Sequence, residues 1–366
     1  MLLGARLSGL RVEAVHHGVT PHAWSPSGLL ASRGLRLIDL PAHHDDAEDV
    51  LQQLSSPPAP LLRRALARTP WLAPALRRGI HGARRLTDGA VLAITAGACW
   101  RGEPRDCSGA MEVNWSRGLV FQTFRRPARN GLLVHDDCVW LAQYALNQGR
   151  TEPMHLWYSD DGGRVFRVKH TFAAGDVRHV HFIQRDRFSG HLWMGTGDRD
   201  AECRLLRSVD QGASWEVVGG GDQRYRAVGL GFTPTAVIWG TDAGRDAGAF
   251  RNRAMRWDRA TERVEPVAWL QGPTHGVTST KDGAIWLTTG VEGGHNELDR
   301  RVHIWQSADD MQWRELASFA AGMQPRRAQY AVAHFPAGAP MGDDIWMGLR
   351  GVMAGDVVAI RARRSD

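Results

Sequence analysis

The chain has few cysteines and no long apolar run. Its 4 cysteines form no CxxC pair, which argues against a zinc knuckle or a thioredoxin-type redox motif and predicts free thiols. The longest apolar stretches, such as residues 90–98, are far shorter than the roughly twenty residues that cross a bilayer, so no transmembrane segment is expected. Charged side chains interrupt residues 1–19, where a signal peptide would have an apolar core. This predicts a cytoplasmic protein, or a secreted one if a leader has been removed.

Tyrosine is scarce, whereas tryptophan and glycine are frequent. Only 4 Tyr are present beside 15 Trp and 41 Gly, a composition that suits short strands and tight turns. The net charge of +6 favours an anionic partner, which leaves nucleic acid, a membrane surface and acidic polysaccharide as candidates. The positive residues are dispersed and no nucleic-acid-binding module is recognised, so nucleic acid is not expected. An acidic polysaccharide or oligosaccharide is the expected partner, and the oligomeric state is left open.

A short motif with the pattern S-x-D-x-G-x-x-aromatic recurs along the chain. It spans Ser159 to Phe166 and again Ser208 to Trp215, a separation of 49 residues. A less complete copy begins at Ser307, 99 residues after Ser208, and the segment 256–259 lies where a turn without the motif should fall between them. Repetition at this interval predicts supersecondary units of about fifty residues.

This motif resembles the Asp box, or bacterial neuraminidase repeat, of the sialidase-like superfamily. In that family the box is a hairpin turn between the third and fourth strands of a propeller blade. Its Asp accepts backbone hydrogen bonds, its Gly takes a positive φ, and its aromatic residue packs between blades. The resemblance implies that Asp161 and Asp210 are structural rather than catalytic.

A second periodic element is a short β-type run that contains tryptophan. Five such runs occur at intervals of 53, 46, 47 and 60 residues, a period typical of four-stranded propeller blades. We predict buried second strands that contain Trp140, Trp193, Trp239, Trp286 and Trp346. The innermost first strands are then expected near Ile80, Leu132, Val180, Ala227, Val277 and Val332.

These repeats predict one all-β domain over residues 1–366, a β-propeller of four-stranded antiparallel blades. Seven blades are favoured, the last closed by pairing of the N- and C-terminal strands, and six is the alternative. The segment 45–78 has helical periodicity and is predicted to be a helical insertion.

The loops that enter the first strands are expected to form one rim of the propeller, where ligands bind. Strand alternation places His179 and His181 on one face, and Arg224 and Arg226 likewise on one face. Arginine at such a rim suits carboxylates and sulfates. We predict that substrate-binding residues are Arg78, His81, Arg178, Arg224, Arg226, His275, Asp198 and Asp242. Asp198 and Asp242 follow second strands. They lie at this rim only if the loops that leave second strands emerge on the same side as the loops that enter first strands.

A polysaccharide lyase acting on a uronate-containing polymer is the favoured function. Such a reaction needs the carboxylate neutralised, a base for the proton next to it, and an acid for the leaving oxygen. Arginines of the rim would neutralise, His179 or His181 would abstract the proton, and Tyr144 or Tyr330 would protonate. The His179-x-His181 pair also resembles part of the metal site of oligogalacturonate lyases, which implies a divalent metal, with His275 as a further ligand.

Two alternatives stand beside the lyase. The first is a sialidase-like glycoside hydrolase, although the Arg-Ile-Pro motif of sialidases is absent. The second is a non-catalytic propeller that binds glycan during production of a surface polysaccharide or exopolysaccharide, because fold does not determine function.

Overall fold

The computed structural model describes most of the chain as short antiparallel strands. The described residues are 2–25, 28–40, 52–54, 57, 79–107, 110–121, 126–322, 330–338 and 344–365. Within these ranges, no helix is both long and apolar enough to span a membrane. The three helical turns are short 3-10 segments: η1 (Arg129–Gly131), η2 (Asp200–Glu202) and η3 (Gln223–Tyr225).

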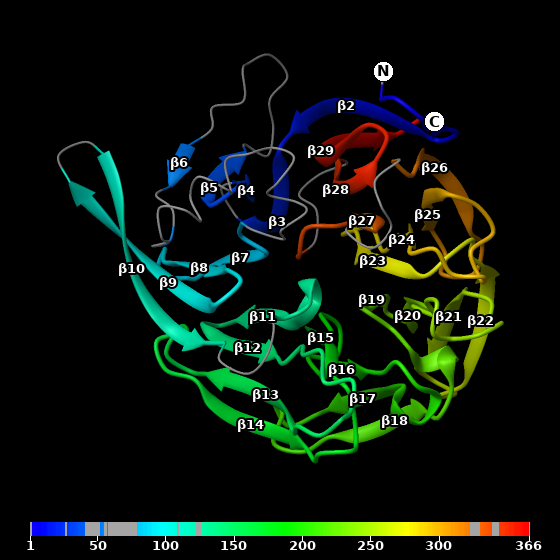
Figure 1. The fold of residues 1–366 in the computed structure, drawn as a ribbon, viewed down its shortest axis with the longest axis horizontal. Coiled ribbons are helices and arrows are strands. Elements are labelled where there is room, and N and C mark those ends of the chain that lie inside the picture. Colours follow the sequence, from blue (N-terminus) through cyan, green and yellow to red (C-terminus); the bar gives the residue numbers. More distant parts are fainter. Residues whose placement is uncertain are drawn as a thin grey trace.

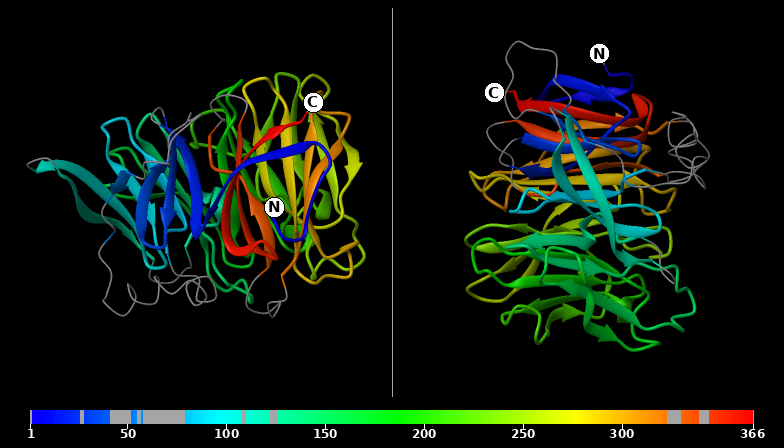
Figure 2. Two further views of the ribbon diagram at one scale, coloured as in Figure 1. Left: turned by 90° about the horizontal axis from the view of Figure 1, so that it is seen from above. Right: turned by 90° about the vertical axis from the view of Figure 1, so that its left-hand side faces the viewer.

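Five separate sheets of four antiparallel strands form most of a propeller-like ring (Figure 1). The first contains β3 (Val19–Ser25), β4 (Gly28–Arg33), β5 (Arg36–Leu40) and β6 (Gln52–Leu54). The second contains β7 (Gly82–Arg85), β8 (Val91–Ile94), β9 (Ala98–Cys107) and β10 (Ala110–Val120). In it, the long β9–β10 hairpin projects away from the ring (Figure 2).

The other three four-stranded sheets follow in chain order. They are β11 (Leu132–His135), β12 (Cys138–Ala142), β13 (Met154–Ser159) and β14 (Arg167–Phe172); β15 (Val180–Arg185), β16 (Leu192–Thr196), β17 (Arg204–Ser208) and β18 (Glu216–Gly220); and β19 (Gly231–Phe232), β20 (Ala236–Gly240), β21 (Arg253–Asp258) and β22 (Val264–Trp269).

The ring is completed by one nine-stranded sheet. It contains β23 (Thr274–Ser279), β24 (Ile285–Val291), β25 (Arg301–Ser307) and β26 (Arg314–Ala320), with β1 (Ala5–Leu7) added outside β26. It continues through β27 (Ala331–His334), β28 (Ile345–Val352) and β29 (Gly355–Arg364) to β2 (Leu10–His17).

The expected seven separate blades are therefore not what the structure shows. The end of β24 runs past its partner β25 and pairs with β27, through Gly290 with Val332 and Val291 with Ala331. This pairing joins two strand groups of the last part of the chain into one sheet. The predicted pairing of the N- and C-terminal strands is confirmed, because β2 lies antiparallel to β29.

The tryptophan-containing runs are second strands, as predicted from their spacing. All five lie in β12, β16, β20, β24 and β28, and each tryptophan is at most 3% exposed. Burial between sheets explains the large apolar side chain at each of these positions. The predicted first strands are also found, although β7 begins after Ile80 and Ala227 forms only an isolated bridge.

The repeated motif forms hairpin turns between third and fourth strands. Between β13 and β14, the Asp161 carboxylate accepts from the amides of Arg164 (2.9 Å) and Val165 (3.0 Å). Between β17 and β18, Asp210 accepts from the Ser214 amide at 2.9 Å, and Asp309 closes the β25–β26 turn in the same way. These carboxylates are held by turn amides, which accounts for their recurrence.

The predicted helical insertion at 45–78 is largely untested. Only 52–54 and 57 of that segment lie within the described residues. Residues 52–54 form strand β6, which pairs with β5, so the prediction of a helix is wrong for these three residues. Pairing with an available sheet edge overrides local helix propensity in so short a piece.

Candidate functional site

The candidate site lies where first strands begin and second strands end. In the β15–β16 pair, Val180 at the start of β15 lies opposite Thr196 at the end of β16. Thr274 and Thr289 have the same relation in β23 and β24. The loops that enter first strands and those that leave second strands therefore emerge on one rim. This meets the condition that the sequence left open for Asp198 and Asp242.

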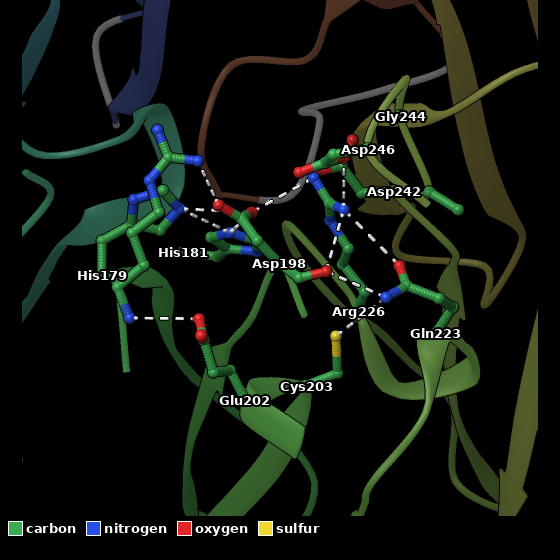
Figure 3. Close-up of polar contacts among 12 residues, drawn as sticks. His179, His181, Asp198, Glu202, Cys203, Gln223, Arg226, Asp242, Gly244 and Asp246 are labelled. Carbon is green, nitrogen blue, oxygen red and sulfur yellow. Dashed lines mark hydrogen bonds and ion pairs between the residues drawn. The ribbon is translucent and has the colours of Figure 1, made fainter. Parts of the chain in front are cut away.

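His179 and His181 face one another at this rim (Figure 3). Their Nε2 atoms are 3.0 Å apart, and the rings are only 2% and 4% exposed. Each Nδ1 lies at hydrogen-bond distance from a backbone carbonyl, that of Ala145 for His179 (3.0 Å) and that of Ala227 for His181 (2.9 Å). A carbonyl only accepts, so each Nδ1 carries a proton, and each Nε2 is turned toward the other ring.

Asp198 completes this arrangement. Its Oδ1 lies 3.6 Å from Nε2 of both His179 and His181. Burial alone would raise the pKa of Asp198, but its interactions with the two histidines outweigh burial and hold the pKa well below its ordinary value. Two ring nitrogens and an ionised oxygen thus converge on one point. We call these three residues the His-His-Asp group.

Arg226 separates this group from a second one. Its Nη2 lies 3.1 Å from Oδ1 of Asp198, its Nε 3.8 Å from Oδ2 of Asp242, and its Nη1 2.8 Å from Oδ1 of Asp246. Burial lowers the pKa of Arg226, yet the surrounding carboxylates, Asp242 first, raise it above the ordinary value. Arg226 is therefore a permanent cation, and it is 6% exposed.

The second group consists of Asp242, His275 and Glu292, from the loop after β20, from β23 and from the loop after β24. We call it the Asp-His-Glu group. Nε2 of His275 lies 3.0 Å from Oε1 of Glu292. Burial raises the pKa of Asp242 to about 6, although Arg226 and His275 oppose the rise. Burial lowers the pKa of His275, but its contact with Glu292 and the charge of Asp242 leave it above the ordinary value.

Two glycines make room for the Asp-His-Glu group. A Cβ at Gly290 would lie 2.7 Å from Nε2 of His275, and a Cβ at Gly244 would lie 2.6 Å from Oε2 of Glu292. Both distances are shorter than any tolerated contact with a Cβ, so a side chain at either position would displace the functional residue.

Tyr144 lies over the His-His-Asp group. Its ring stacks on that of His179 at a centroid distance of 4.0 Å and an interplanar angle of 24°. Burial and the charges of Asp198 and Asp242 raise its pKa to about 12. The phenol is therefore protonated at neutral pH and available as a proton donor.

The predicted residues divide into those brought together and those that are not. His179, His181, Asp198, Arg226 and Tyr144 meet at one place, and Arg178 joins them through an ion pair with Asp198. Asp242 and His275 belong to the neighbouring group, so His275 does not complete a ligand set with the histidine pair.

Other predicted residues lie elsewhere. Arg224 turns to solvent, where it pairs with Asp222 at 2.7 Å; residues 223–225 form η3, so the strand alternation expected for Arg224 and Arg226 is wrong. His81 contacts Arg126 at 3.0 Å, and Tyr330 precedes β27, outside both groups as defined above. Arg78 lies outside the described residues.

Sequence reasoning underweighted two residues of the site. Glu292 and Asp246 stand in loops after second strands, and only the folded ring shows that these loops meet Arg226 and His275. The available signal was position, an acidic residue within a few places of the ends of the strands that contain Trp193, Trp239 and Trp286. That signal is weak, because acidic residues are common in turns.

Comparison with known proteins places the fold. No protein-family model matches the sequence, and no curated protein sequence matches it. An oligogalacturonate lyase in complex with manganese superposes with a TM-score of 0.59 at 10% identity, covering 100% of this chain and 97% of its own. An oligogalacturonate lyase from Vibrio parahaemolyticus gives 0.55 at 12% identity, with 98% of each chain covered. A Trichoderma reesei enzyme of carbohydrate-active family AA12 gives 0.50 at 9% identity, covering 78% of this chain and 93% of its own. At these identities the likeness shows a shared propeller fold.

Proposed function

We propose that this protein is a carbohydrate-active enzyme, most specifically a lyase that cleaves a uronate-containing oligosaccharide or polysaccharide with a divalent metal bound at the His-His-Asp group. The observation that carries the proposal is the convergence of His179, His181 and Asp198. Supporting it, two solved structures of the same fold are oligogalacturonate lyases, and one of them is in complex with manganese.

The donor set fits a divalent cation. Nε2 of His179 lies 3.0 Å from Nε2 of His181, and the potential ligand atoms of His179, His181 and Asp198 all lie within 4.8 Å of one another, so one cation could take all three as ligands. Imidazole nitrogen together with carboxylate oxygen binds Zn²⁺, Mn²⁺ and related ions, and the Nδ1 contacts to Ala145 and Ala227 are the outer-shell bonds that orient such ligands. When bound, the metal would neutralise the carboxylate of the sugar and make the adjacent proton more acidic.

The assignment of roles follows from which groups remain free to move protons. The Nε2 atoms of His179 and His181 face each other, which suits metal binding better than proton abstraction. Asp242 has a pKa of about 6, near neutrality, and is the proposed proton acceptor. Arg226 lies between the two groups, where its charge offsets those of Asp198 and Asp242.

The proposed reaction is a β-elimination. Asp242 takes the proton from the carbon next to the carboxylate, and the electron pair forms a double bond to the neighbouring ring carbon. The bond from that carbon to the glycosidic oxygen breaks. Tyr144, which stays protonated below its pKa of about 12, gives its proton to the leaving oxygen.

The test measures new double bonds. The protein is incubated with a panel of acidic oligosaccharides and polysaccharides, and the ultraviolet absorbance of unsaturated uronate ends is followed with added Mn²⁺ or Zn²⁺ and with chelator. We expect turnover that requires metal and is lost in His179→Ala and His181→Ala. His155→Ala is the matched control, because His155 lies on β13 and contacts Thr171.

Two results would contradict the proposal. Release of saturated sugar without new absorbance would favour the glycoside hydrolase. Binding of the polysaccharide without any product, unaffected by His179→Ala, would favour a non-catalytic glycan-binding propeller.

A further inference from the structure

A second set of basic side chains lies on the other inner strands of the ring, apart from both groups described above. These side chains come from β3, from β7 and the residue before it, from the segment before β11, and from β27. These strands surround the axis together with β15, β19 and β23 (Figure 1). We call them the axial basic group: His22, His81, Arg84, Arg126, Arg129 and His334.

Arg84 and Arg129 connect neighbouring inner strands through main-chain carbonyls. Arg84 donates from Nη1 to the carbonyls of Ala83 (2.8 Å) and His22 (3.3 Å) and from Nη2 to that of Leu132 (3.0 Å). Arg129 donates from Nη1 to the carbonyl of Pro21 at 3.4 Å. Both guanidinium groups are therefore held against β3, at the inner edge of the ring.

These two arginines have no carboxylate partner within the described residues. Their hydrogen bonds there go only to carbonyl oxygens, which carry no net charge, and each guanidinium has five N–H donors. Arg226, by contrast, has three carboxylates around it. Arg84 and Arg129 thus keep both their charge and unused donors.

The surroundings raise the cost of these charges. Burial, followed by the charges of Arg350, Arg126 and Arg84, lowers the pKa of Arg129 well below its ordinary value. The same causes, burial first and nearby arginines next, lower the pKa of His22, His81 and His334. His81 accepts a hydrogen bond from Arg126 at 3.0 Å, which also requires a neutral ring nitrogen. Arg84 and Arg129 are therefore two buried like charges that pair with no carboxylate in the described part of the chain.

One further polar atom points to a missing ligand. Nε2 of His22 contacts Oγ of Ser32 at 2.8 Å, but its Nδ1 is buried without a hydrogen-bond partner among the described residues. His22 as a whole is 3% exposed. A buried ring nitrogen without a partner is costly, and this one stands beside Arg84 and Arg129.

We propose that the axial basic group is an oxyanion-binding site, with Arg84 and Arg129 as its principal donors. A carboxylate, sulfate or phosphate accepts two parallel hydrogen bonds from one guanidinium, and such an anion would offset the mutual repulsion of the arginines. The ligand is either a free inorganic oxyanion or the carboxylate of an acidic sugar, which share this chemistry.

The site lies close to the His-His-Asp group without overlapping it. Asn130, next to Arg129, donates to the carbonyl of Val228 at 2.9 Å. Ala227, next to Val228, is the residue whose carbonyl contacts Nδ1 of His181. An acidic oligosaccharide could thus reach both sites, but the proposal does not require this.

The experiment measures anion binding directly. Sulfate, inorganic phosphate and galacturonate are titrated separately at constant ionic strength by calorimetry, and thermal unfolding is followed with chloride as the reference salt. We expect saturable binding and a rise in Tm for wild-type protein, and at least tenfold weaker binding in Arg129→Gln. Arg224→Gln, which changes a solvent-exposed arginine paired with Asp222, is the matched control and should bind as the wild type does.

Each outcome decides between support and refutation. Binding of phosphate or sulfate but not galacturonate identifies an inorganic ligand, and the reverse identifies an acidic sugar; both support the site. Absence of saturable binding for all three anions, or equal binding by Arg129→Gln and wild type, overturns it. If Arg129→Gln does not fold, Arg129→Lys retains the charge and should show weaker but measurable binding. His179→Ala should bind the anion normally, which separates failure of this site from failure of the proposed lyase.

Discussion

Asp242 offers a sharp test of the electrostatic reasoning, because its burial makes the folded protein less stable at neutral pH. Its pKa is raised from an ordinary value of 3.8 to about 6, so the folded state binds a proton more tightly than the unfolded state. The free energy of unfolding contributed by this carboxyl is therefore highest below about pH 4. It falls as pH rises from about 4 to about 6 and stays low above that range.

The substitution Asp242→Asn removes the charge while keeping the side-chain size. A shift of about two pKa units corresponds to about 3 kcal/mol at 1.36 kcal/mol per unit, already net of the attraction to Arg226. We expect the variant to be more stable than the wild type by about 3 kcal/mol at pH 8 and about equal to it at pH 4. Stabilisation by removal of a functional residue is a common trade-off at such sites.

The assay is urea denaturation at pH 4 and pH 8, with chelator present to exclude metal. Asp246→Asn is the matched control, because Asp246 also pairs with Arg226, at 2.8 Å, but its side chain is 52% exposed. We expect that control to change the free energy of unfolding little at either pH. If Asp242→Asn is less stable than the wild type at pH 8, the attraction between Arg226 and the Asp242 carboxylate stabilises the fold more than burial of that charge destabilises it. This result would refute the reasoning.

Three further predictions concern single positions. Gly290→Ala should push the ring of His275 away from Glu292 and return the pKa of His275 toward its ordinary value, as read from an NMR titration; an unchanged titration would contradict the close packing. Asp161→Ala should lower the free energy of unfolding by about 1–2 kcal/mol at pH 7 in urea denaturation. That loss should fade as pH falls, because the folded pKa of Asp161 is below its ordinary value, and a loss that persists at low pH would show a different cause. Trp239→Ala removes a fully buried ring and should cost about 3–5 kcal/mol in the same assay; a cost below about 1 kcal/mol would show that the site collapses around the cavity.

Much of the fold was predictable because the repeats are local. The turn at Asp161 is made by atoms within a few residues, and the run around Trp239 is long enough to pair and to be buried. Both signals therefore survive in a single sequence. The number of separate sheets was not predictable, because it depends on two residue pairs between β24 and β27 that no local pattern encodes.

The candidate site was predictable in part for the same reason. The i, i+2 spacing of His179 and His181 places both rings on one face, and the structure confirms that they meet. The same spacing was misleading for Arg224 and Arg226, because η3 replaces the expected strand. Local backbone conformation decided which of the two arginines reaches the carboxylates.

The sequence by itself determined the repeating unit, the buried tryptophans and the paired histidines, because each rests on interactions between residues near in the chain. Only the tertiary structure decided that Asp198 and Arg226 meet the histidines, that Asp242, His275 and Glu292 form a neighbouring group, and that basic residues gather on the remaining inner strands. Closure of the ring brings these loops together across large separations in sequence. The pKa values of the site residues and the balance of charge around them depend on this proximity, so they cannot be inferred from any single residue in the sequence.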